Sequence, residues 1–136
     1  MRGTPQAQPD FLTVVNLNAT VPAEHPLRAI KRRVDTVLQK LSPLFNDLYA
    51  KEGRPSIPPE QLLKARVLCA LYSVRSERLF CEQLSYNLLW LWFLEREFAQ
   101  GSFDHSIFAK NYQRVLSAEV AKLFFAEIYD LSRQEG

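Results

Sequence analysis

The sequence has only four glycines in 136 residues, and none of them belongs to a glycine-rich phosphate-binding loop. It contains neither the GxSxG nor the HExxH pattern of hydrolytic enzymes. Its two cysteines and two histidines match no zinc-site spacing. The carboxylates stand in separate segments without a paired context, as solvated surface acids and helix caps do. We therefore expect no metal, no cofactor and no catalytic residue in this chain.

The sequence also lacks a hydrophobic run that could cross a membrane. The longest uncharged apolar run, Leu88–Leu94, is far shorter than the about 20 residues that a membrane-spanning helix needs. No N-terminal segment has the order of a signal peptide. Cys69 and Cys81 lie in apolar segments and are predicted to be buried, reduced thiols. These absences favour a cytoplasmic protein that does not bind a membrane.

Neither sign of charge dominates the composition. The 17 lysines and arginines and the 15 aspartates and glutamates leave a net charge of +2. So small a charge does not itself indicate nucleic-acid binding, and any basic face must come from the distribution of charges. Hydrophobic residues make up 47% and charged residues 24% of the sequence, which is typical of a folded protein, and the length suits one domain.

Strand patterns are nearly absent, whereas apolar residues recur at helical spacing. We predict an all-α fold, a compact bundle of six or seven helices. Residues 1–20 are expected to form a flexible or extended arm, and residues 21–136 a single helical domain. Ser76, Asp104 and Ser117 are predicted N-caps. The predicted helices cover about 26–41, 44–49, 59–74, 76–86, 88–94, 105–115 and the residues after 117.

Three of these helices could form a helix-turn-helix-like arrangement. The helices at 59–74 and 76–86 are joined by a short turn, and the later helix at 105–115 would present its polar side to a DNA groove. Hydroxyl, amide and guanidinium groups are the donors that read base edges or hold phosphates. The predicted DNA-binding residues are Arg54, Arg75, Arg78, His105, Ser106, Lys110, Asn111 and Arg114. The alternative is that these side chains form an ordinary solvated helix surface.

The apolar run Leu88–Leu94 also allows two interpretations. Trp90, Trp92 and Phe93 could belong to the core of the domain. A short helix that is apolar on every side could instead bury one face against another chain. This second interpretation makes the three aromatic residues candidates for a protein interface.

Four phrases of the sequence occur together in one protein family. They are GRPSIPPEQLL at 53–63, LYSVRSER at 71–78, EQLSYNLL at 82–89 and FDHSIFAKN at 103–111. With HPLR at 25–28, they closely resemble the N-terminal domain of bacterial insertion-sequence transposases of the InsH type, which are DDE transposases. The resemblance covers about residues 20–126.

The resemblance implies a helical domain that recognises the terminal inverted repeats of a mobile element during DNA transposition. In the family this domain precedes a ribonuclease-H-like domain, whose acidic triad binds divalent metal and cuts and rejoins DNA. That catalytic half has no counterpart in this sequence, so we expect no enzymatic activity from this chain alone. The expected partner is double-stranded DNA in the bacterial nucleoid. The alternative is a dimerisation or regulatory module that pairs with a second copy or with a full-length transposase.

Two positions depart from the family pattern. Leu91 and Tyr112 stand where arginine is usual in the family. If both arginines contact phosphates, their loss lowers the affinity of this chain for DNA and flattens the salt dependence of binding by about one unit of slope for each contact.

Overall fold

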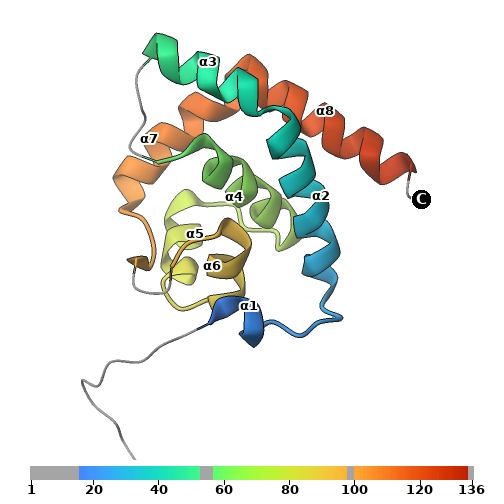
Figure 1. Cartoon of the computed structure of the whole chain (residues 1–136). Helices are drawn as coiled ribbons and strands as arrows, with labels where there is room; N and C mark the ends of the chain where they lie inside the picture. Colours follow the sequence, from blue (N-terminus) through green and yellow to red (C-terminus); the bar gives the residue numbers. More distant parts are fainter. Residues whose placement is uncertain (1–15, 53–56, 98–99, 135–136) are drawn as a thin grey trace, which may run out of the picture.

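The computed structural model describes residues 16–52, 57–97 and 100–134 (Figure 1). These residues form α-helices and contain no strand, so the all-α prediction is confirmed. There are eight helices in this part of the chain, more than predicted. They are α1 (Leu17–Thr20), α2 (Pro26–Lys40), α3 (Ser42–Glu52), α4 (Pro59–Leu71), α5 (Glu77–Leu84), α6 (Leu88–Leu94), α7 (His105–Leu116) and α8 (Glu119–Gln134).

Most helix starts follow from local capping. The Ser76 side chain accepts from the Leu79 N–H, and the Asp104 carboxylate accepts from the N–H groups of Ser106 and Ile107, so both predicted N-caps are confirmed. Ser117 differs from the prediction, because it ends α7 and its hydroxyl donates to the Arg114 carbonyl.

Part of the predicted N-terminal arm is folded. The Asn16 side chain caps α1, and Leu17 packs against the core. The Asn18 Oδ1 accepts from Trp92 Nε1 at 3.2 Å and from Arg28 at 3.1 Å. These contacts dock residues 16–20 on α2 and α6, while residues 1–15 lie outside the described part.

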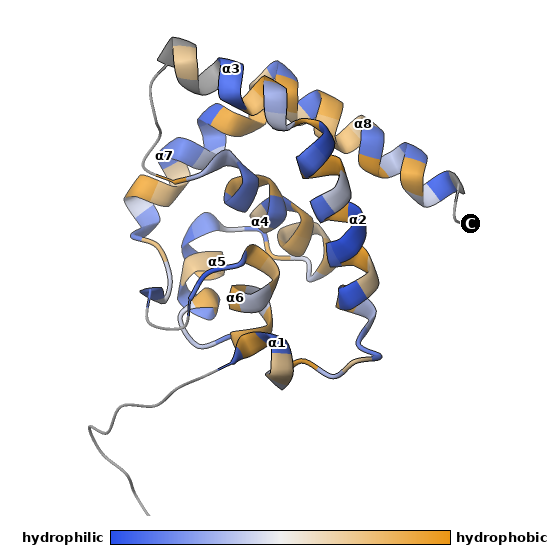
Figure 2. Cartoon of the chain, viewed as in Figure 1, coloured by the Kyte–Doolittle hydropathy of each residue, from blue (hydrophilic) through white to orange (hydrophobic). Residues whose placement is uncertain are grey.

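Helix α4 lies at the centre of the fold, with α2 and α7 on opposite sides of it (Figure 1). Its side chains Leu62, Leu63 and Leu68 are fully buried. Helix α4 packs against α6 and α7, α5 packs against α7, and α8 packs against α2 and α7. The outer helices α2, α7 and α8 carry both hydrophilic and hydrophobic residues, whose apolar stripes supply the core (Figure 2).

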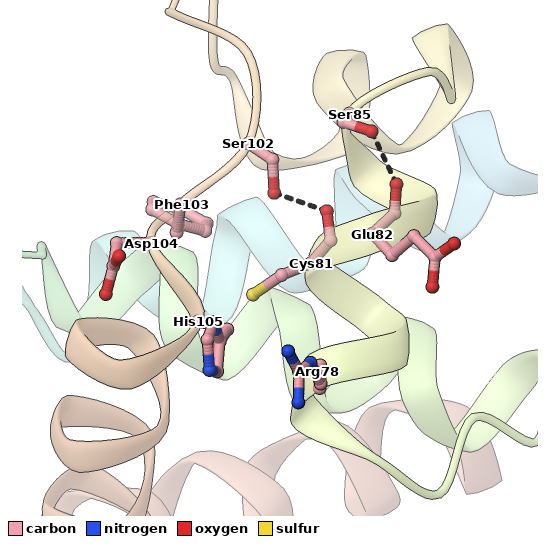
Figure 3. A pocket seen from close by; sticks show the side chains of 8 residues that line it. All are labelled: Arg78, Cys81, Glu82, Ser85, Ser102, Phe103, Asp104 and His105. Atoms are coloured by element: carbon pink, nitrogen blue, oxygen red, sulfur yellow. Dashed lines mark hydrogen bonds between the residues drawn. The ribbon is translucent and has the colours of Figure 1, made fainter.

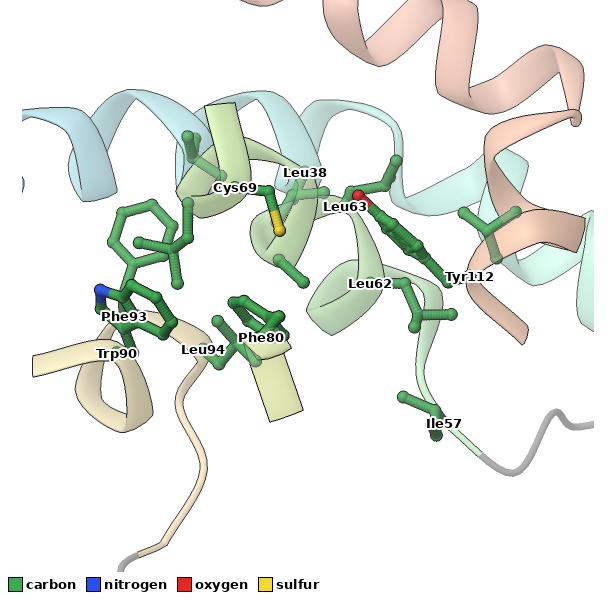
Figure 4. Packing of buried hydrophobic residues seen from close by; sticks show 14 of the residues in the cluster. Leu38, Ile57, Leu62, Leu63, Cys69, Phe80, Trp90, Phe93, Leu94 and Tyr112 are labelled. Atoms are coloured by element: carbon green, nitrogen blue, oxygen red, sulfur yellow. The ribbon is translucent and has the colours of Figure 1, made fainter. Parts of the chain in front are cut away.

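A chain of stacked aromatic rings crosses the core. Trp90 on α6 stacks on Phe80 of α5 with ring centroids 5.1 Å apart, and Phe80 stacks on Phe108 of α7 at 5.5 Å. Phe108 also stacks on Tyr112 at 5.1 Å. Figure 4 shows Trp90, Phe80 and Tyr112 in this order across the core. The aromatic chain therefore fixes α7 against α5 and α6.

A charged cluster holds α2 against α4 and the end of α6. Lys64 on α4 is only 3% exposed, and its Nζ lies 2.7 Å from the Asp35 carboxylate of α2. Lys31 reaches both Asp35 and Glu95 at 2.8 Å. Burial opposes the charge on Lys31, but its hydrogen bonds to the two carboxylates outweigh it and raise the Lys31 pKa. Each buried ammonium group thus has a carboxylate partner.

We predict that replacing Asp35 destabilises the protein more than replacing Lys64 does. Asp35→Asn leaves the buried Lys64 ammonium with Glu95 at 3.9 Å as its remaining carboxylate, and should lower the free energy of unfolding by about 3 kcal/mol. Lys64→Met leaves Asp35 with Lys31 and with solvent, because the Asp35 side chain is 37% exposed, and should cost about 1 kcal/mol. Urea denaturation measures both.

The control for this comparison is Glu127→Gln, which breaks the exposed ion pair between Lys40 and Glu127 and should change stability by at most about 0.5 kcal/mol. An equal or greater cost for Lys64→Met than for Asp35→Asn would contradict the interpretation of the cluster.

Candidate nucleic-acid interface

Helix α7 combines a buried stripe with a polar outer face. Phe108, Tyr112 and Val115 are buried against the core. The side chains that point away from this stripe are exposed: Ser106, Lys110, Gln113 and Arg114. We call these four residues the outer face of α7. Because Lys110 and Arg114 are four residues apart, they are neighbours on this face.

The remaining polar candidate on α7 has a partner within the helix. The Asn111 side-chain Nδ2 donates to the Ile107 carbonyl at 2.8 Å, so this amide is held against its own helix. Ile107 is apolar, but it is 49% exposed and flanks the outer face. Its position follows from the burial of Phe108 and Tyr112, which turns the Ile107 side of the helix toward solvent.

The corner between α4 and α5 positions two further candidates. Ser73 has a positive φ of 57°, and the chain turns there after α4 ends at Leu71, earlier than predicted. Arg75 is exposed in this turn, and Arg78 is exposed in the first turn of α5. Helix α5 is linked to α7 by a hydrogen bond of 2.9 Å from Gln113 Nε2 to Glu77 Oε1. Arg54, the last candidate, lies outside the described residues.

Arg78 and His105 meet at a hollow between α5 and the start of α7 (Figure 3). The hollow has a volume of about 390 Å³ and is also lined by Cys81, Glu82 and Asp104. Five candidates thus stand on α7, namely His105, Ser106, Lys110, Asn111 and Arg114, and Arg78 joins them across the hollow.

The segment that leads into α7 is held by Arg96. Its Nε donates to the Gly101 carbonyl at 2.7 Å, and its guanidinium lies 3.9 Å from the centre of the Phe103 ring. Phe103 in turn stacks on Phe108 at 5.4 Å. Burial lowers the Arg96 pKa without removing its charge. Sequence analysis did not identify Arg96, because its partners are backbone carbonyls that no pattern marks.

Comparison with known protein families identifies the family to which the chain belongs. Residues 15–114 match the transposase domain family DUF772, from α1 to the outer face of α7. The chain belongs to this transposase domain family. No curated protein and no solved structure matches it.

The transposase domain offers no cluster for metal chemistry in its described part, where no three His, Cys, Asp or Glu residues come together in a way that could hold a metal ion. Burial raises the pKa of the Cys81 thiol to about 11, so this cysteine is protonated at neutral pH and is not an activated nucleophile. None of the described helices is long and apolar enough to span a bilayer.

The apolar run of α6 lies inside the transposase domain. Trp90, Trp92 and Phe93 are buried in the core formed by this chain, as the first interpretation predicted. They present no exposed surface to a second protein. A dimerisation module would therefore need a surface other than these three side chains.

The two positions where the family resemblance led us to expect arginine are also interior. Leu91 is 1% and Tyr112 is 6% exposed. Burial raises the Tyr112 pKa, and its hydroxyl interacts with Cys69 and with Arg66, an exposed α4 residue that sequence analysis missed. Neither side chain lies on the surface of the chain, so Leu91 and Tyr112 contribute to its core, and the expected loss of DNA affinity stays a prediction.

We predict that Tyr112 acts through packing. Tyr112→Phe should preserve the slope of DNA affinity against salt and change stability by less than about 1 kcal/mol, because the ring remains. Tyr112→Ala should cost about 3 kcal/mol in thermal or urea unfolding. Tyr129→Ala is the matched control, since Tyr129 is 63% exposed, and should stay within about 0.5 kcal/mol. A flatter salt slope for Tyr112→Phe would contradict this assignment.

Proposed function

We propose that this chain is a DNA-binding domain of a transposase and that it recognises the terminal inverted repeats of a mobile element. The observation that supports this function best is the outer face of α7. It carries exposed donors on a helix that is held by aromatic stacking, and it belongs to a domain of a transposase family. A rigid helix with an exposed polar face suits DNA recognition.

The charge distribution supports the proposal more strongly than the net charge does. Helix α7 carries Lys110, Arg114 and His105 and contains no acidic residue. By contrast, residues 115–136 contain four acidic and two basic residues. Helix α2 carries more basic residues, but its Lys31 and Lys40 are paired with carboxylates, whereas within the described residues Lys110 and Arg114 of α7 have no ion-pair partner. These two side chains of α7 are therefore available to a DNA backbone.

The dimensions of α7 suit the major groove. Its 12 residues span about 18 Å, and the major groove of about 12 Å admits an α-helix. Lys110 and Arg114 would contact phosphates or guanine edges, and Ser106 could donate to a base or a phosphate. Asn111 would read an adenine only after giving up its hydrogen bond to Ile107.

The corner of α4 and α5 would support this docking. In the proposed helix-turn-helix-like arrangement, Arg75 at the turn contacts the DNA backbone while α7 enters the groove. Cleavage and joining of DNA would come from a ribonuclease-H-like domain with divalent metal, as the family resemblance implies, and not from the residues described here. The expected location of this activity is the bacterial nucleoid.

The proposal predicts that charge on the outer face of α7 supports DNA binding. A duplex enriched from a random-sequence library by binding to the chain serves as the probe, with fluorescence anisotropy at several salt concentrations. Lys110→Gln and Arg114→Gln should each weaken binding about tenfold and flatten the salt slope by about one unit. Neither change should lower the melting temperature by more than a few degrees, because both side chains are exposed.

Lys122→Gln is the matched control, since it removes the same charge from the exposed surface of α8. It should bind DNA within twofold of the original chain. Equal affinity of all three variants would remove α7 from the interface, and failure of the library to enrich any duplex would overturn the proposed function itself.

A further inference from the structure

The hollow between α5 and the start of α7 is lined by both basic and acidic side chains. Arg78 comes from the first turn of α5 and His105 from the first residue of α7. Figure 3 shows their nitrogen-bearing groups converging on each other below the Cys81 sulfur. Within the described residues neither side chain has a carboxylate in ion-pair distance, so both donors are available to an anion.

The two carboxylates at this hollow do not occupy its centre. The Asp104 Oδ1 accepts from the N–H groups of Ser106 and Ile107, each at 3.0 Å, and is thereby committed to the start of α7. In Figure 3 the carboxylates of Glu82 and Asp104 point outward on either side of the pair formed by Arg78 and His105. The donor groups of Arg78 and His105 therefore lie between the two carboxylates, in a hollow with a mixed wall.

We propose that this hollow binds one phosphate of a DNA backbone between Arg78 and His105, and that protonation of His105 tightens the binding. The inference rests on the proposed function and adds a defined phosphate subsite to it. A guanidinium is suited to hold two phosphate oxygens, and the protonated imidazole adds a charged donor.

The positions along α7 favour a phosphate of DNA as the ligand. His105 and Arg114 are nine residues apart, which places their side chains on opposite sides of the helix. A helix in the major groove has the backbone of one strand on each of its sides. The hollow would therefore hold the backbone of one strand while Arg114 reaches that of the other.

The phosphate in the hollow, beside His105, sets the direction of the expected pH effect. Those that face it are Arg78, Cys81 and Glu82 from α5 and Asp104 before α7. Cys81 remains neutral at neutral pH. Histidine ordinarily changes charge between about pH 5 and 8, and a phosphate favours its protonated form. The DNA affinity is therefore highest at the acidic end of this range and falls as the pH rises through it.

The first arm of the test measures DNA affinity at about pH 6 and about pH 8 at constant ionic strength, with the enriched duplex as the probe. The original chain should bind about five to ten times more tightly at the lower pH. His105→Gln should lose this difference and bind at both pH values as the original chain does at the higher one. Arg78→Gln should flatten the salt slope by about one unit.

Arg32→Gln is the control for this arm, because it removes an exposed arginine from α2, across α4 from α7, and it should behave as the original chain (Figure 1). His25 remains in every variant, so a pH effect that persists in His105→Gln belongs elsewhere and overturns the inference. An unchanged salt slope in Arg78→Gln overturns it as well. Absence of DNA binding at both pH values overturns the proposed function instead.

The second arm uses the unmodified chain, so it does not depend on the folding of a variant. The imidazole NMR signals of His105 are followed while inorganic phosphate replaces chloride at constant ionic strength, and then while the duplex is added. The duplex should shift these signals at far lower concentration than inorganic phosphate. A site for free phosphate alone would respond to inorganic phosphate and not to the duplex, and that result would overturn the assignment to DNA.

Discussion

The position of the Phe108 ring determines how α7 meets its surroundings. This fully buried ring stacks on Phe80 of α5, on Phe103 of the preceding segment and on Tyr112 of its own helix, with centroid distances of 5.5, 5.4 and 5.1 Å. Stacked aromatic pairs contribute specific geometry in addition to apolar burial. Once Phe108 is inside, helical periodicity requires Lys110 and Arg114 to face outward. The proposed DNA interface is thus a consequence of core packing.

A second, polar set of contacts fixes how the helices pack around that core. The Lys64–Asp35 pair joins α4 to α2, and Glu95 brings the end of α6 to the same cluster. Glu95 itself has a positive φ of 59°, at the point where the chain leaves α6. Arg96 follows directly and holds the segment before α7 through the Gly101 carbonyl. Burying ammonium groups is costly unless each has a carboxylate partner, so these contacts admit few alternative arrangements of the helices.

The sequence was sufficient to predict the all-α class and most helix starts, because capping and apolar periodicity are local. The N-caps Ser76 and Asp104 are examples. It was insufficient where tertiary packing decides: Leu79 is exposed although it is apolar, and Lys64 is buried although lysine is rarely so. The partners of Lys64 lie on other helices, which no local pattern reveals. The five candidates on α7 share one helix as predicted, whereas the hollow that joins Arg78 to His105 appears only in three dimensions.

The proposed DNA-binding surface of this transposase domain consists of α7 and the adjoining part of α5. The most direct measurement is a map of backbone amide NMR shifts in the isotope-labelled chain as a DNA duplex enriched by binding is added. The largest changes should occur from Asp104 to Ser117 and in the first turns of α5, with little change in α2 and α8. Changes that concentrate on α2 and α8 and spare α7 would contradict the proposal.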